Sequence, residues 1–197
     1  MKQTSKLSAF ALAAAIASTN SIAMAQDIYL TEQGHTEVIF GWAHANVSKQ
    51  HGEFTKASGT LTLVNEKLED SSLDVTIDMS SINTGVVALD DNLKTRSFLF
   101  VEKFPEATFK STSIELTGDK TANVNGDLTL HGVTKPVTLK TTLTHKGRHP
   151  VGQFISSFKG EWIAFHATTV LNHQSFGIGG YSTGPIFIEI NTELKLQ

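Results

Sequence analysis

Residues 126–143, Gly-Asp-Leu-Thr-Leu-His-Gly-Val-Thr-Lys-Pro-Val-Thr-Leu-Lys-Thr-Thr-Leu, decide the fold class of this chain. Apolar and polar residues alternate on both sides of a turn, and the apolar set is Leu128, Leu130, Val137, Leu139 and Leu143. Alternation with a period of two predicts strands with one buried face and one wet face. Gly132 lies in the turn, and we expect Pro136 to open the second strand, where a missing N–H does least harm. The stretch therefore predicts a β-hairpin.

The same alternation recurs along the chain at short intervals. Its apolar positions are Val38, Phe40 and Trp42; Leu61 and Leu63; Leu73, Val75, Ile77 and Met79; Phe109, Ile114 and Leu116; Phe154, Phe158 and Trp162; and Ile186, Ile188 and Ile190. About eight strands separated by turn residues predict a mainly all-β chain, folded as an antiparallel barrel or sandwich.

One segment, residues 80–104, lacks this alternation. Leu89 and Leu93 lie one helical turn apart, with acidic residues at the start of the segment and basic residues toward its end. That charge order favours a short helix. We expect short helical turns across one end of the barrel, which serve either as a lid or as a plain connection.

The N-terminal residues have the pattern of a secretory signal peptide. Lys2 and Lys6 precede an apolar run over residues 7–17, and Ala23-Met24-Ala25 forms a cleavage site. We therefore expect a signal peptide over 1–25, a single domain over 26–197, and a periplasmic or secreted protein. The absence of cysteine excludes disulfides and a lipid anchor at the cleavage point.

Net charge and hydropathy argue against several classes of binding partner. The chain carries a formal net charge of −3, which argues against nucleic acid or an anionic membrane surface as its partner. Beyond the leader, no segment is long and apolar enough to predict an integral membrane helix.

Catalytic and metal-binding motifs are weak. Gly180-Tyr181-Ser182-Thr183-Gly184 matches the G-x-S-x-G of hydrolases, but Pro185 and a strand pattern follow it where a helix is needed. The eight histidines match no metal-binding motif. The sequence therefore predicts no catalytic residue, no metal site, no cofactor and no enzymatic activity.

What remains is the interior of the barrel, which in an eight-stranded barrel is either filled by side chains or holds one small ligand. Such a cavity would be lined by the apolar faces of the strands and would suit a long apolar molecule. The candidate lining residues, each of which is either cavity wall or plain core, are Phe40, Trp42, Val75, Ile77, Phe109, Leu128, Leu130, Leu139, Phe158 and Trp162.

The block Gly126–Val137 resembles the signature of the YceI family. Supporting blocks occur in the family's order: His35-Thr36, Val75–Asp78 with Ser81–Gly85, Val101–Pro105 with Thr108–Ser111, and Ala167–Thr169 with Ser175–Gly177. The resemblance runs from about residue 27 to the C-terminus. It implies a lipocalin-like antiparallel barrel exported to the periplasm, often as a homodimer. It also implies an elongated cavity for an isoprenoid-type lipid, either a polyisoprenoid or an isoprenoid quinone.

Two positions depart from the family pattern, and other functions stay open. The lid helix of the family usually carries a histidine where Asn92 stands, and an acid near Phe100. The leading hypothesis is a lipid-binding protein for transport, storage or sequestration. The alternatives are a binder of amphiphilic fatty acids or amides that uses Lys94, Arg96 or histidine residues, a small outer-membrane β-barrel, and an enzyme on the same barrel.

Overall fold

A computed structural model describes residues 25–179 and 184–197. The predicted signal peptide, apart from Ala25, lies outside the described residues. So does most of the G-x-S-x-G segment, including its serine.

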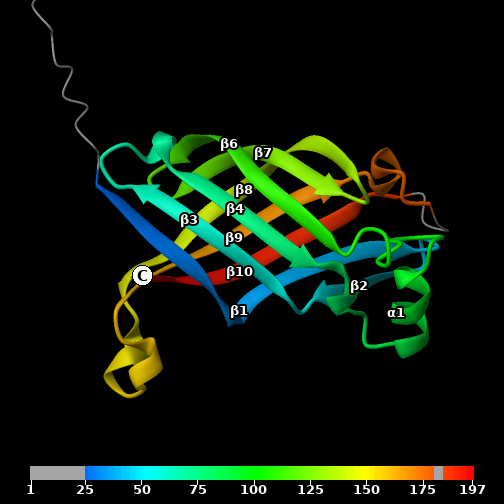
Figure 1. The fold of residues 1–197 in the computed structure, drawn as a ribbon, viewed down its shortest axis with the longest axis horizontal. Coiled ribbons are helices and arrows are strands. Elements are labelled where there is room, and N and C mark those ends of the chain that lie inside the picture. Colours follow the sequence, from blue (N-terminus) through cyan, green and yellow to red (C-terminus); the bar gives the residue numbers. More distant parts are fainter. Residues whose placement is uncertain (1–24, 180–183) are drawn as a thin grey trace, which may run out of the picture.

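The described chain folds into one antiparallel sheet that closes on itself (Figure 1). The strands are β1 (Gln26–His44), β2 (Ser48–Phe54), β3 (Ala57–Val64), β4 (Ser72–Asp78), β5 (Ile82–Asn83), β6 (Glu106–Gly118), β7 (Thr121–Leu130), β8 (Val133–Arg148), β9 (Glu161–Leu171) and β10 (Ile186–Leu196). They follow the order β10-β9-β8-β7-β6-β4-β3-β1, and pairing of β10 with β1 closes the barrel. The predicted barrel of about eight strands is confirmed, with β2 and β5 as short extensions beside β1.

Strand β1 is long and changes its partner along its length. Its first half pairs with β3, its second half pairs with β2, and its register against β10 shifts between Thr31 and Thr36. The bend at this irregularity is visible in Figure 1. An irregularity of this kind lets one strand serve two neighbours in turn.

The β7–β8 hairpin has a two-residue turn. Leu130 pairs with Val133, and His131 and Gly132 between them have φ values of 53° and 75°. Positive φ at both central residues is the tight turn whose twist matches that of the strands, and Gly132 adopts it without steric cost.

Pro136 does not open the second strand, as expected from the sequence, but lies inside β8 opposite Asp127. The pairing of β8 with β9 begins only at Lys140. Pro136 therefore occupies a part of β8 with one unpaired edge, where a missing N–H leaves the ladder intact.

The helical segments lie at the two ends of the barrel. Helix α1 (Val87–Lys94) confirms the predicted helical turns in 80–104. The short 3-10 helices are η1 (Leu68–Asp70), η2 (Met79–Ser81), η3 (Pro150–Gln153), η4 (Ser156–Phe158) and η5 (His173–Phe176). Figure 1 shows α1 at one end and the yellow excursion with η3 and η4 at the other.

The sequence predicts a strand through Phe154 and Phe158, and this prediction is wrong. Both residues lie in the excursion after Pro150, and β9 begins only at Glu161. Proline at the start of η3 and a positive φ of 114° at Gly160 favour turns over an extended strand here. The apolar spacing in this segment therefore reflects packing of the excursion and not a strand.

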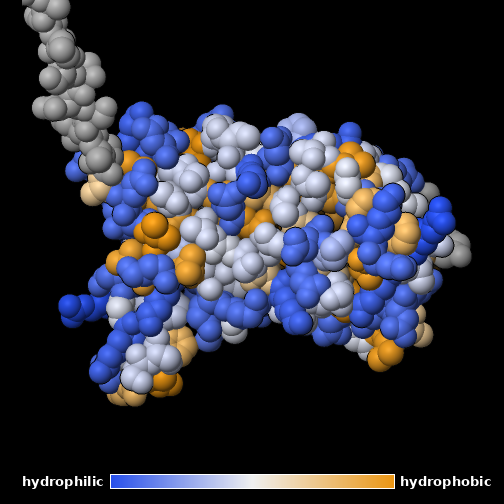
Figure 2. Space-filling view, viewed as in Figure 1, coloured by the Kyte–Doolittle hydropathy of each residue, from blue (hydrophilic) through white to orange (hydrophobic). Residues whose placement is uncertain are grey.

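The interior of the barrel holds a packed cluster at the end away from α1, which we call the packed end. Its fully buried members are Tyr29, Leu61, Leu63, Ile163 and Leu194, all at most 6% exposed. Leu68 of η1 packs against this cluster. The strand faces that point outward are mainly polar, and hydrophilic residues predominate on the face shown in Figure 2.

Candidate functional site

A cavity of about 500 Å³ fills the barrel interior at the end covered by α1, which we call the hollow end. This size is within the range of small-molecule sites. Inward-pointing side chains of the strands form its wall, and residues of α1, of the segment after it and of η5 form its cover.

Eight of the ten predicted lining residues lie on this wall. They are Phe40, Trp42, Val75, Ile77, Phe109, Leu128, Leu130 and Leu139. The strand pairing explains why they meet, because Val75 lies opposite Phe109 and Phe109 lies opposite Leu128. Residues opposite each other on paired strands share a face of the sheet.

Phe158 and Trp162 are not on the cavity wall, which corrects the expectation from sequence. Ile163 packs into the inner cluster, so its neighbour Trp162 points outward. Trp162 is only 2% exposed because the excursion covers it. Its ring stacks on Phe158 at 5.4 Å, and its Nε1 donates a hydrogen bond to the Phe158 carbonyl.

Further wall residues carry the same strand alternation as the predicted ones, but were not singled out from sequence. They are Val137 on β8, Leu171 on β9, and Ile186, Ile188 and Ile190 on β10. Their period of two was the available signal. Phe98 and Leu99, which also line the cavity, follow α1 in an irregular segment that has no periodic signal.

Helix α1 covers the cavity with two apolar side chains. Leu89 and Leu93, one turn apart, both line the cavity, while no residue of α1 is fully buried. Asp90 fixes the start of the helix, because its carboxylate accepts hydrogen bonds from the N–H and the hydroxyl of Thr84, at 2.7 and 2.6 Å. An element with so little buried surface belongs to the less stable parts of a fold, as expected for a lid.

The short helix η5 and the residues after it cover the cavity beside α1. The Asn172 side chain accepts a hydrogen bond from the Gln174 N–H and so caps the helix. Phe176 and Ile178 are buried, and His173, at 8% exposed, lines the cavity. The hairpin tip lies beside η5, because His131 Nδ1 donates a hydrogen bond to the Phe176 carbonyl at 3.3 Å.

The cavity wall is apolar and uncharged. Among the described lining residues there is no Asp, Glu, Lys or Arg. The side chains with polar atoms are those of His44, Asn92, Thr169 and His173, together with the indole N–H of Trp42. Asn92, where the family usually has histidine, therefore lies at the cavity itself, whereas Lys94 and Arg96 are not part of the lining.

The ionisable groups with shifted pKa values lie outside the cavity lining. The Ser80 hydroxyl donates to the Asp78 carboxylate and lowers its pKa, in the turn that follows β4. Burial in the packed end raises the pKa of Tyr29. Neither group is placed to act on a molecule in the cavity.

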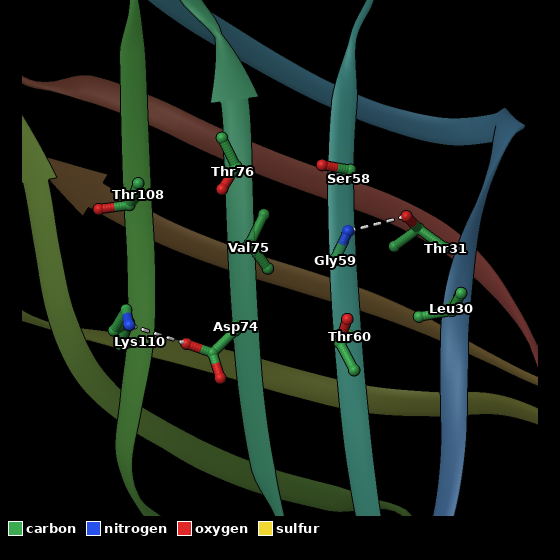
Figure 3. Close-up of a pocket in the computed structure, with 10 residues that line it drawn as sticks. All are labelled: Leu30, Thr31, Ser58, Gly59, Thr60, Asp74, Val75, Thr76, Thr108 and Lys110. Carbon is green, nitrogen blue, oxygen red and sulfur yellow. Dashed lines mark hydrogen bonds and ion pairs between the residues drawn. The ribbon is translucent and has the colours of Figure 1, made fainter.

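A second hollow, of about 430 Å³, lies across β1, β3, β4 and β6 (Figure 3). It is lined mainly by polar groups, including the ion pair of Asp74 with Lys110 at 3.6 Å. The Gly59 N–H donates to the Thr31 hydroxyl at 2.9 Å, so side chains of β1 satisfy the backbone of β3 here. Since its two charged groups already pair with each other, this hollow is the weaker candidate for a ligand.

Three further observations on the described ranges concern metal binding and insertion into a membrane. They contain no group of three His, Asp or Glu side chains arranged to hold a metal ion. The apolar faces of the strands point inward, which is the reverse of outer-membrane barrels, whose apolar residues face lipid. No helix in the described part is long and apolar enough to cross a membrane.

Comparison with known proteins agrees with this architecture. Residues 29–197 match the family model described as the YceI-like domain. A UPF0312 protein of Pseudomonas savastanoi pv. phaseolicola is 39% identical over 192 residues, which cover 97% of this chain and 95% of that protein.

Two solved structures share the fold. The Burkholderia cenocepacia protein BcnA superimposes with a TM-score of 0.71 at 20% identity, over 83% of this chain and 98% of that one. A polyisoprenoid binding domain from Saccharophagus degradans gives a TM-score of 0.64 at 11% identity, over 86% of this chain and 98% of that one.

Proposed function

Because this chain belongs to the YceI family, whose members are binding proteins, we propose that it holds an isoprenoid-type lipid in the cavity at the hollow end. The ligand is a polyisoprenoid or an isoprenoid quinone, bound without covalent chemistry. The protein carries, stores or sequesters this lipid and has no catalytic activity.

The observation that carries the proposal is the uncharged, apolar wall of a cavity of about 500 Å³. Side chains that face an empty apolar cavity lack packing partners on one side. An apolar chain supplies those partners, and each CH₂ group that it buries contributes about 0.8 kcal/mol. Ordering the chain offsets part of this gain. A long hydrocarbon chain therefore suits this wall better than a polar metabolite does.

One structural neighbour supports the same ligand class. The Saccharophagus degradans domain of the same fold is described as polyisoprenoid-binding, and it shares the barrel that encloses the cavity here. We therefore assign Phe40, Trp42 and Phe109, with the other five predicted wall residues, as contacts for the chain of the lipid.

Entry of a lipid requires the cover to move. Helix α1 is the element of the cover with no fully buried residue, and its contribution to the wall rests on Leu89 and Leu93. We propose that α1 moves away as a lid to admit the lipid and closes over its chain.

The site of action we propose is the periplasm. YceI-like proteins are periplasmic, and the N-terminal residues of this chain have the pattern of a cleaved leader. A binding protein that shields an apolar chain from water would there carry it through an aqueous compartment.

The alternative of a fatty acid or amide ligand has less support. It rests on a head-group contact from Lys94, Arg96 or a histidine, and of these only histidines, His44 and His173, are among the cavity lining. The guanidinium of Arg96 instead lies 5.7 Å from the centre of the Phe100 ring.

The test is to purify the protein from its natural cell without detergent, extract it with organic solvent and identify the extracted lipids by mass spectrometry. We expect an isoprenoid lipid at close to one molecule per chain. The control is V137W, which places a large side chain into the cavity and should carry none. Wild-type protein that carries no lipid and gains no thermal stability from added isoprenoids would contradict the proposal.

A further inference from the structure

The wall of the cavity contains one buried polar side chain without a partner. In the described part of the chain, two buried side-chain nitrogens have no hydrogen bond, Nε2 of His131 and Nδ1 of His173. Only His173 lines the cavity. Buried polar groups in proteins are almost always hydrogen bonded, so an exception on the wall of a binding cavity points to a missing partner.

The two histidines differ in their hydrogen bonds and ring contacts. His131 has one nitrogen paired with the Phe176 carbonyl, and its ring packs against Phe104 at 4.5 Å. Nδ1 of His173 has no hydrogen-bond partner, although the residue is more than nine-tenths buried. The ring of His173 is thus held by its short helix and not by a hydrogen bond at Nδ1.

The local structure fixes where the His173 ring lies. It is the first residue of η5, directly after Asn172, whose side chain caps the helix. The Ile178 N–H donates to the His173 carbonyl at 3.3 Å, which ties the backbone of the helix to the next cover segment. The backbone that carries the ring is therefore anchored on both sides.

We propose that a ring nitrogen of His173 hydrogen bonds the head group of the ligand, and that this head group is a neutral oxygen function, a carbonyl or a hydroxyl, on a long apolar chain. This inference rests on the proposed function. A neutral imidazole offers one donor and one acceptor, so it can pair with either oxygen function.

We infer a neutral head group because the described lining of the cavity has no Asp, Glu, Lys or Arg. A phosphate, diphosphate or carboxylate placed beside His173 would be desolvated, and the described lining offers no Lys or Arg to pair with it. Of the other lining side chains with polar atoms, those of Trp42, Asn92 and Thr169 are uncharged, and that of His44 is exposed to solvent. A wall of this composition favours an isoprenoid alcohol or quinone over an isoprenoid phosphate.

The experiment compares three probes that share a farnesyl-type chain by isothermal titration calorimetry. Farnesol carries a hydroxyl, farnesyl diphosphate carries a diphosphate, and farnesene has no head group. Wild-type protein should bind farnesol more tightly than farnesene, and farnesyl diphosphate more weakly than farnesol. H173F removes both ring nitrogens and keeps the ring shape. It should weaken farnesol about tenfold, the loss of one hydrogen bond, and change farnesene by less than about twofold.

Rescue variants separate a hydrogen bond from a packing role. H173N keeps a polar atom near the position of Nδ1, and H173Q keeps one near Nε2, so one of the two should restore farnesol binding and identify the nitrogen. The matched control H145F changes a histidine near the packed end and should leave all three affinities unchanged. Thermal unfolding checks that each variant is folded, and the rescue variants carry the test if H173F is not.

Each other outcome overturns part of the account. If H173F leaves farnesol binding unchanged, or if farnesol and farnesene weaken equally, His173 does not bind the head group, although the cavity still binds lipid. Tighter binding of farnesyl diphosphate than of farnesol would overturn the neutral head group. If wild-type protein binds none of the probes, the proposed function itself is wrong.

Discussion

The two ends of the barrel are built from the same strands but differ in how their interiors are filled. At the packed end, Tyr29, Ile163 and Leu194 from different strands meet, and each is at most 3% exposed. At the hollow end, Phe40, Phe109 and Leu139 are also buried, at most 8% exposed, but Ile186 and Ile188 are only partly buried around a cavity of about 500 Å³.

This difference assigns separate roles to the two ends. Close packing at one end supplies stability to the closed sheet, since interiors of folded proteins are normally filled to high density. The hollow end forgoes that contribution, and its wall keeps contact area free for another molecule. The helices at the two ends differ in the same way. Leu68 of η1 packs against the packed cluster, whereas no residue of α1 is fully buried.

The largest expected effect compares two positions of β10 whose side chains share the inner face, Leu194 and Ile188. L194A removes a fully buried side chain of the packed end and should lower the free energy of unfolding by about 2–5 kcal/mol. I188A borders space that is already empty, so it should cost clearly less. Urea denaturation of both variants measures the difference, and equal losses would mean that the two ends are packed alike.

Substitution by a larger side chain should also cost more at the packed end than at the hollow end. The two positions compared lie on β8, where Val137 lines the cavity and Leu143 packs against the packed cluster. L143W overfills a packed region and should cost about 1–3 kcal/mol. Val137 packs against the buried Phe109 and Leu139 on one side and borders the cavity on the other, so V137W should cost less than L143W while it abolishes lipid binding. A large destabilisation by V137W, measured in the same denaturation experiment, would show that the hollow end has no room.

Gly126 allows close approach of β6 and β7 between the two ends. An added Cβ would lie 2.5 Å from the Lys110 carbonyl oxygen and would also meet the Phe109 ring. G126A should therefore force these strands apart and cost about 1–3 kcal/mol. D127A, at the exposed neighbouring position, is the matched control and should stay within about 0.5 kcal/mol of wild type. Thermal unfolding that gives the same shift for both variants would argue against this close approach.

The smallest expected effect is a loss of stability at acid pH that arises from the carboxylate of Asp78 near the hollow end. The Ser80 hydroxyl lowers the pKa of Asp78, so the folded state favours the carboxylate. Its stabilisation is present above the ordinary pKa of about 3.9 and is lost as the pH falls through the lower value of the folded protein.

Asp78 is 38% exposed, so its contribution should stay below about 1 kcal/mol. D78N should lower stability at neutral pH and reduce the loss on acidification, in denaturation curves recorded across this range. D74N, which changes another surface carboxylate of β4, is the control. An acid dependence in D78N identical to that of wild type would remove Asp78 as its source.

The sequence predicted the wall better than the cover because the two rest on different physical signals. Strand alternation is a local property, and it placed Phe40, Leu128 and Leu139 on the inner face before any pairing was known. A different signal, the four-residue spacing of Leu89 and Leu93 together with the order of the charges, predicted the helix at one barrel end. Strand alternation was also available at Ile186, Ile188 and Ile190, so these could have been selected too.

The errors arose where a position depends on distant parts of the chain. Trp162 is apolar and buried, but it is covered from outside by the excursion, and no local pattern distinguishes the two faces of β9. His173 carries no sequence signal either, because its burial depends on how η5 packs against the barrel. Residues of this kind require the tertiary structure.

The central claim is that the hollow end is a lipid site, and ligand-dependent thermal stability tests it most directly. A ligand that binds only the folded state adds about 2.7 kcal/mol at a hundredfold excess over its Kd. We predict that the melting temperature of wild-type protein rises by several degrees with increasing farnesol and that the melting temperature of V137W does not change. An unchanged melting temperature for wild type, or equal rises for both proteins, would contradict the account.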